Sequence, residues 1–132
     1  PTAAKEAVKT LMEIGKGKKK AIVLGEMRDL GSLSTIVHKE LGEFIARSNI
    51  SYLITVGRTA KIVADSAKEA KFRGSIQTFS NTKEATKFLK QLLNKKWVVL
   101  VKGSRHEHLE RIVYAIQHKS THIICYHCGP LR

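Results

Sequence analysis

Two carboxylates follow the first apolar run of the chain, inside a short segment bounded by glycines. Gly25–Gly31 reads Gly-Glu-Met-Arg-Asp-Leu-Gly, so Glu26 and Asp29 lie three positions apart. Carboxylates in such a loop can contact ribose hydroxyls, an amine or a metal ion. Paired loop carboxylates are also common as solvated surface groups. The spacing alone therefore leaves both interpretations open.

A second candidate segment, Lys102–Arg105, follows a later apolar run and leads directly into a predicted helix. Its glycine lets a ligand approach the backbone closely, and the free N–H groups of a following helix suit an anionic group. For any one such glycine, there or at Gly57, plain turn chemistry is the commoner explanation. The chain lacks both G-x-G-x-x-G and the P-loop pattern, so we do not expect it to cleave a nucleotide unaided.

Five short apolar runs rich in β-branched or aromatic residues are predicted to form buried strands. They are Ala21–Leu24, Tyr52–Val56, Ser75–Phe79, Trp97–Val101 and His122–Tyr126. In open α/β sheets, ligands bind beyond the carboxyl ends of the strands. Both candidate segments therefore lie where a binding site is expected.

Amphipathic helical patterns separate these runs. The first helix is predicted to begin at Pro1, end near Gly15–Gly17 and bury Ala4, Val8, Leu11 and Met12. The second, capped by Ser32 or Ser34, is predicted to bury Ile36, Val37, Leu41, Phe44 and Ile45. The third begins near Thr59 and buries Ala60, Val63, Ala67 and Ala70. The fourth, capped by Asn81 or Thr82, buries Ala85, Phe88, Leu89, Leu92 and Leu93. The last buries Leu109, Ile112, Val113 and Ile116.

Strands that alternate with helices predict right-handed βαβ crossovers. We therefore expect an α/β fold with a doubly wound, mainly parallel sheet of five or six strands and helices on both faces. Since no linker divides the 132 residues, the chain is expected to form a single domain over residues 1–132.

The composition, 42% apolar and 27% charged, is that of a globular protein. No apolar run is long enough for a membrane span, and a cytoplasmic location is expected by default. The 24 Lys and Arg against 11 Asp and Glu give a formal charge of +13, which favours anionic partners. Nucleic acid is not the favoured one, because the cations are spread along the chain and few aromatic residues are interleaved among them.

Two long motifs carry a resemblance to a known family. Lys20–Gly31, K-A-I-V-L-G-E-M-R-D-L-G, and Val99–Arg105, V-L-V-K-G-S-R, resemble in order two stretches of the C-terminal domain of Mur ligases that add D-alanyl-D-alanine. Ser34–Gly42, with His38, and Ile54–Gly57 are similar to the segments between them. Pro1-Thr2 resembles the end of the motif that opens this domain. The likeness spans residues 1–118, whereas residues 119–132 diverge.

The resemblance implies a Rossmann-like domain that closes over the remainder of an ATP-dependent ligase. That ligase joins D-alanyl-D-alanine to UDP-N-acetylmuramoyl-tripeptide in peptidoglycan synthesis, and its N-terminal and central domains are expected partners of this chain. ATP and Mg²⁺ are bound mainly by the central P-loop domain. The chain is therefore expected to start inside a longer protein, to hold no catalytic residue and to be inactive alone.

The resemblance also implies roles for individual residues. Glu26 is expected to reach the ATP ribose and Lys19 or Lys20 its phosphates, although the family more often has Asp and Arg at these places. His38 is expected either to orient a loop carboxylate or contact nucleotide, or to be a structural histidine. The dipeptide is expected to meet four residues, of which Arg105 and Glu110 could instead form a solvated ion pair. The four are Lys102, Ser104, Arg105 and Glu110.

The C-terminal tail contains possible metal ligands, and two other functions are compatible with the sequence. His122, Cys125, His127 and Cys128 are zinc ligands by type, but seven residues are too few for one tetrahedral site, so no metal is predicted. One rival function is a related Mur or folylpolyglutamate-type ligase with another nucleophile, against which K-G-S-R argues. The other is a stand-alone basic module that binds nucleotide or nucleic acid.

Overall fold

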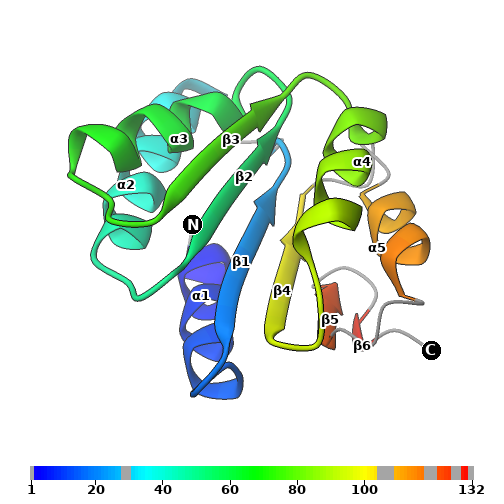
Figure 1. Cartoon of the computed structure of the whole chain (residues 1–132). Coiled ribbons are helices and arrows are strands. Elements are labelled where there is room, and N and C mark those ends of the chain that lie inside the picture. The colour runs from blue at the N-terminus through cyan, green and yellow to red at the C-terminus, as the bar shows by residue number, and fades with distance from the viewer. Residues whose placement is uncertain (1, 28–30, 104–108, 118–121, 126–128, 131–132) are drawn as a thin grey trace.

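Alternating strands and helices run the length of the chain in the computed structural model (Figure 1). The structure describes residues 2–27, 31–103, 109–117, 122–125 and 129–130, with side chains for 3–27, 31–103 and 109–117. Its helical elements are α1 (Thr2–Ile14), the 3₁₀ turn η1 (Gly31–Leu33), α2 (Ser34–Ala46), α3 (Ala60–Glu69), α4 (Thr82–Leu92) and α5 (Glu110–Ile116). Its strands are β1 (Lys19–Leu24), β2 (Tyr52–Val56), β3 (Ser75–Phe79), β4 (Trp97–Lys102), β5 (His122–Cys125) and β6 (Gly129–Pro130).

The sheet has six strands in the order β3-β2-β1-β4-β5-β6. All neighbouring strands are parallel except β6, which pairs antiparallel with β5. The predicted doubly wound α/β fold is confirmed. The order reverses between β1 and β4, and such a switch point is where open α/β sheets bind ligands. In the divergent tail, Gly129–Pro130 form β6 and extend the sheet.

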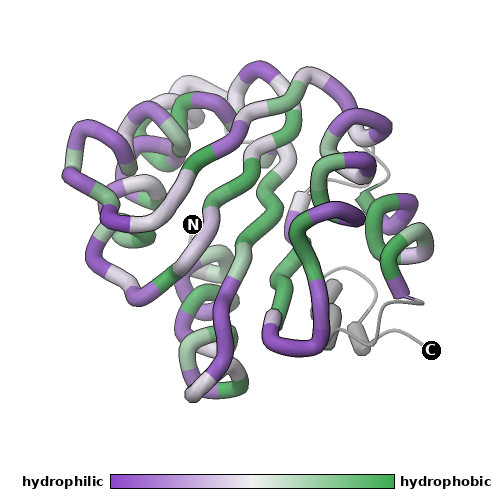
Figure 2. Tube along the Cα trace, in the orientation of Figure 1, coloured by the Kyte–Doolittle hydropathy of each residue, from purple (hydrophilic) through white to green (hydrophobic). Residues whose placement is uncertain are grey.

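The core consists of two apolar layers, one on each face of the sheet. Alternate residues of each central strand point to opposite faces, so β1 sends Ala21 and Val23 to one layer and Ile22 and Leu24 to the other. Helices α4 and α5 cover the first layer, and α1, α2 and α3 cover the second. Figure 2 shows the apolar strands enclosed by helices whose outer turns are hydrophilic.

Helices α2 and α3 approach unusually closely. A Cβ on Gly42 would lie 2.5 Å from the backbone oxygen of Val63, so only glycine fits at this crossing. The buried face of α2 is His38, Leu41, Gly42 and Ile45. Ile36 was predicted to be buried but is 54% exposed, because this face is rotated toward α3. Ala70 also lies exposed at the end of α3, contrary to prediction.

Side-chain capping was predicted correctly at only one of two helices. Asn81 accepts a hydrogen bond from the backbone N–H of Glu84 at 2.9 Å and caps α4 as expected. Neither Ser32 nor Ser34 caps α2: the cap residue is Leu33, and no side chain bonds there, because the turn η1 leads straight into the helix.

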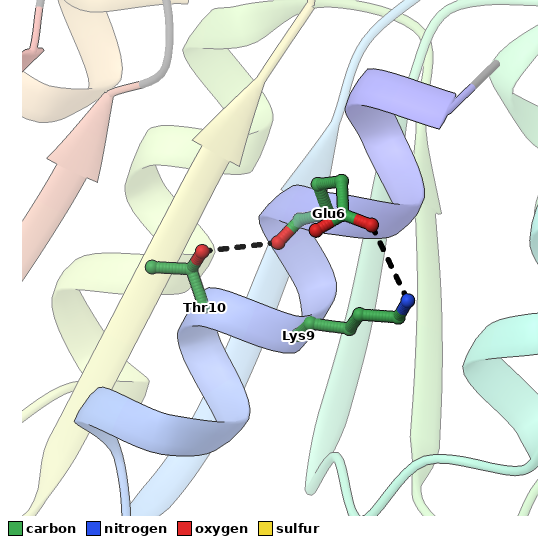
Figure 3. Close-up of polar contacts among 3 residues, drawn as sticks. All are labelled: Glu6, Lys9 and Thr10. Carbon is green, nitrogen blue, oxygen red and sulfur yellow. Dashed lines mark hydrogen bonds and ion pairs between the residues drawn. The ribbon is translucent and has the colours of Figure 1, made fainter.

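The outer face of α1 is stabilised by local polar contacts (Figure 3). Lys9 Nζ lies 3.3 Å from Glu6 Oε1, and the Thr10 hydroxyl donates to the Glu6 backbone oxygen at 3.0 Å. The pair is exposed, so it adds only about 0.3–0.5 kcal/mol. None of the helices in the described part of the chain is long and apolar enough to span a bilayer.

Candidate functional site

Glu26 is positioned by a hydrogen bond between two elements. It follows β1 directly, and its Oε2 accepts a hydrogen bond from the Thr59 hydroxyl at 2.8 Å. Thr59 is the cap residue of α3, but its side chain makes no capping bond to the helix. The hydroxyl that could cap α3 therefore holds the carboxylate at the end of β1 instead.

Gly57 provides the space for this carboxylate. Its φ is +103°, which side-chain-bearing residues rarely adopt. A Cβ there would lie 2.7 Å from Glu26 Oε1 and 2.9 Å from Glu26 Cγ. Gly57 is therefore required both by the backbone and by the close approach of Glu26.

A hollow of about 430 Å³ opens at the carboxyl ends of β1, β2 and β3. Glu26 supplies a carboxylate to its lining, and Arg58 and Lys61 supply two cations. Lys61 also lies 3.8 Å from Asp65 in an exposed pair that leaves about 60% of each side chain in solvent. The rest of the lining is Gly57, Thr78, Phe79 and Ser80. Both charge signs and hydroxyl groups therefore meet a ligand that enters this hollow.

Lys102, the first residue of the second predicted segment, lies beside Gly25 across the switch point. The Gly25 backbone N–H donates to the Lys102 oxygen at 2.8 Å, and Lys102 pairs in register with Leu24. Glu110 is the first residue of α5, which follows β4 from the same edge. Ser104 and Arg105 lie outside the described residues. The structure thus brings Glu26, Lys102 and Glu110 to one edge of the sheet, as the sequence predicted.

Lys19 and Lys20 lie at the opposite edge, which corrects the expectation that they share a nucleotide with Glu26. They begin β1, whereas Glu26 follows its end, and the strand's length separates the two positions by about 17 Å. Lys20 is 6% exposed, and its Nζ donates to the Lys18 backbone oxygen. The Nζ of Lys19 lies 5.6 Å from the ring centroid of Trp97. Neither lysine faces the hollow.

His38 is a fully buried residue of α2. Its Nδ1 donates to the Ser34 backbone oxygen at 2.6 Å, which assigns the ring proton to Nδ1. Its Nε2 is buried and has no hydrogen-bond partner. With no exposed surface in this conformation, His38 offers no atom to a nucleotide. This burial favours the structural interpretation.

Sequence reasoning missed the hollow's residues beyond Glu26 and Gly57. Arg58, Lys61, Thr78 and Ser80 lie at or just beyond the ends of β2 and β3. The rule that ligands bind beyond the carboxyl ends of the strands, which selected Gly25–Gly31, would also have selected these positions. No motif marks them, and that is why they were passed over.

No group of three or more His, Cys, Asp or Glu suited to hold an ion occurs among the described residues. Of the tail's four candidates, His122 and Cys125 are in β5 and His127 and Cys128 lie outside the described residues. The prediction of no metal in this chain stays a prediction.

Comparison with known proteins defines the class of protein. The family model described as Mur ligase, glutamate ligase domain, matches residues 1–105. The chain therefore belongs to the Mur ligase family.

Within that family, the chain is similar to ligases that share one name. The UDP-N-acetylmuramoyl-tripeptide--D-alanyl-D-alanine ligase of Bacillus subtilis is 30% identical over 113 residues, which cover 86% of this chain and 25% of that protein. The ligase of the same name from Buchnera aphidicola (subspecies Baizongia pistaciae) is 38% identical over 96 residues, which cover 71% of this chain and 20% of that protein. The chain thus spans about a quarter of the length of these relatives.

Solved structures of two MurF ligases are similar to this chain in fold. The crystal structure of MurF from Acinetobacter baumannii superposes with a TM-score of 0.75 at 26% identity, covering 90% of this chain and 26% of that one. MurF ligase from Thermotoga maritima in complex with ADP gives a TM-score of 0.65 at 26% identity, covering 88% of this chain and 26% of that one.

Proposed function

We propose that this chain is the C-terminal domain of the ATP-dependent ligase that adds D-alanyl-D-alanine to UDP-N-acetylmuramoyl-tripeptide. The relatives carry that name, and the strands of the two motifs that resemble theirs, β1 and β4, pair at the switch point of the sheet. This proposal rests on the position of Glu26, Lys102 and Glu110 at this edge of the sheet, next to a hollow whose lining carries both charge signs.

On this proposal the chain supplies half of a cleft, and the remainder of the ligase supplies the other half. Two large apolar side chains at the start of α2 are unusually exposed, Leu33 at 58% and Ile36 at 54%. Helix α2 begins at the same edge as the hollow, because it is the helix that follows β1, after the turn η1. Exposed apolar groups at this edge support its role as the surface that closes on the other domains.

Substrate contacts follow from charge and position. We assign Glu26 to the ATP ribose and Lys102, Ser104, Arg105 and Glu110 to the dipeptide, whose carboxylate suits cations and whose ammonium suits a carboxylate. One observation favours a second assignment for the hollow itself. Because Glu26, Arg58 and Lys61 line it together, it also fits a zwitterion such as the dipeptide.

Mg²⁺ and the triphosphate belong, on this proposal, to the remainder of the ligase. The described residues hold no cluster of metal ligands, and the sequence contains no P-loop. Mg²⁺ would supply charge neutralisation at the phosphates. The residues of this chain would orient the substrates and exclude water as the cleft closes.

The test is a coupling assay with the intact ligase that contains this chain. Each reaction contains ATP, either UDP-N-acetylmuramoyl-tripeptide or another muramyl acceptor, and one of four nucleophiles: D-alanyl-D-alanine, L-lysine, L-glutamate or D-glutamate. We expect amide formation only with the dipeptide and the tripeptide acceptor. Coupling of a single amino acid in its place would favour a related Mur or folylpolyglutamate-type ligase. Retention of nucleic acid with no response to any muramyl acceptor would favour the basic-module alternative.

A further inference from the structure

The amino-terminal edge of the sheet, opposite the hollow, has an unusual charge distribution. Four short connections meet there: residues 15–18 before β1, 47–51 before β2, 70–74 before β3 and 93–96 before β4. None of these four described connections contains Asp or Glu. Exposed or partly exposed cations lie in them and on the first residue of β1; we call this set the basic edge: Lys16, Lys18, Lys19, Arg47, Lys71, Arg73, Lys95 and Lys96.

Backbone contacts hold parts of the basic edge together. The Lys19 N–H donates to the Lys96 oxygen at 2.9 Å, so the connections before β1 and β4 are adjacent. The nearest carboxylates along the chain, Glu13, Glu43 and Glu69, lie on the last turns of the preceding helices, and they leave the cations in excess. Lys9, on the outer face of α1, is instead paired with Glu6 (Figure 3).

Lys71 is a cation at a position where glycine is the better backbone residue. It follows the end of α3 with φ +63° and is the single positive-φ residue other than glycine in the described chain. The left-handed conformation costs a side-chain-bearing residue about 1 kcal/mol. Glycine is the usual residue after a helix for this reason.

We propose that the basic edge is a docking surface for an anionic phospholipid membrane. Each Lys or Arg near such a surface adds favourable electrostatic energy, and the effect depends on the number of cations on one side. Ile14, at the end of α1 next to Lys16, is 54% exposed and adds an apolar group that can enter the interface. The chain would bind peripherally, with its hollow directed away from the lipid.

The same residues fit nucleic acid less well. Lysine predominates over arginine in the basic edge, whereas arginine is preferred where phosphates are bound through paired hydrogen bonds. Trp97 is 5% exposed, and Phe72 packs against the core, so neither ring is available to stack on a base. The connections are short, and none projects as an element that would enter a groove.

Vesicle binding of the 132-residue chain tests this inference independently of ligase activity. The probes are vesicles of phosphatidylcholine alone and vesicles with about 30 mol% phosphatidylglycerol, in about 0.15 M salt. The edge variant is Lys16→Gln, Lys95→Gln and Lys96→Gln. The matched control is Lys39→Gln, Lys83→Gln and Lys87→Gln, three exposed lysines of α2 and α4 outside the edge. Both variants have the same net charge, so a difference between them reports where the charge lies.

We expect the wild type and the control to sediment with the anionic vesicles and not with the neutral ones. The edge variant should bind the anionic vesicles on the order of 100-fold more weakly than the wild type. Three results would overturn the proposal: no binding by the wild type, equal losses in both variants, or preferential binding of duplex DNA or RNA over the anionic vesicles. Circular dichroism of both variants checks that each is folded.

Discussion

The two edges of one sheet differ in charge, shape and packing. At the carboxyl edge a carboxylate and two cations share a hollow, and Glu26 is held in place by Thr59 and Gly57. At the amino edge the connections contain cations alone, with no carboxylate among the four described loops. Mixed charge with positioned side chains fits the proposed recognition of a small molecule, whereas one-sided charge fits the proposed docking on an extended anionic surface.

The largest expected effect is a difference in ATP hydrolysis between the isolated chain and the intact ligase. The purified 132-residue chain should hydrolyse no ATP, because its sequence contains no P-loop, whereas the intact ligase should turn ATP over when both other substrates are present. Phosphate release measured with and without the muramyl tripeptide checks this. Turnover by the isolated chain that is lost in Glu26→Gln would show that the carboxyl edge is a complete site.

Glycine substitution at the two edges should differ in its effect on stability. Gly57→Ala should lower the free energy of unfolding by about 2–4 kcal/mol, because it adds backbone strain and a contact with Glu26. Gly17→Ala at the amino edge, with φ +79° and open space around a Cβ, should lose only about 1 kcal/mol. Urea unfolding of both variants measures the difference. Equal losses of unfolding free energy would show that the close approach of Glu26 does not determine the residue at position 57.

Sequence reasoning succeeded where a local pattern suffices. Strands β2 and β3 were predicted at their observed bounds, and the Asn81 cap was correct, because apolar runs and capping side chains act over a few residues. The prediction that β3 is buried was wrong: it is an edge strand without a buried residue, and its place in the sheet cannot be read from a local pattern. It failed for Ile36 and for the cap of α2, because these depend on how α2 rotates against α3 around Gly42.

The candidate site shows the same division. Glu26 and Lys102 were expected at the carboxyl ends of two strands, and Lys102 ends β4 beside the end of β1, the strand that precedes Glu26. Their roles in binding stay predictions. Lys19 was misassigned, because a resemblance in sequence does not show that the strand lies between that residue and Glu26. The hydrogen bond from Thr59 to Glu26 joins residues 33 positions apart, and no local pattern predicts it.

The smallest expected effect is at Lys71. Lys71→Gly should raise the free energy of unfolding by roughly 0.5–1 kcal/mol, because glycine relieves the left-handed backbone. The same variant should weaken binding to anionic vesicles by about fivefold. Thermal unfolding and vesicle sedimentation measure the two effects. Greater stability with unchanged vesicle binding would remove Lys71 from the basic edge.

The central claim is that substrates of the ligase bind at the carboxyl edge and not at the amino edge. Steady-state kinetics of the intact ligase, comparing Glu26→Gln with Lys96→Gln, test it most directly. We predict that Glu26→Gln raises KM for ATP about 10- to 100-fold, since a hydrogen bond to a charged group is lost. Lys96→Gln should leave KM for ATP and KM for the dipeptide unchanged. A rise in KM for the dipeptide instead would assign the hollow to that substrate. Unchanged KM values in Glu26→Gln, or a raised one in Lys96→Gln, would contradict the claim.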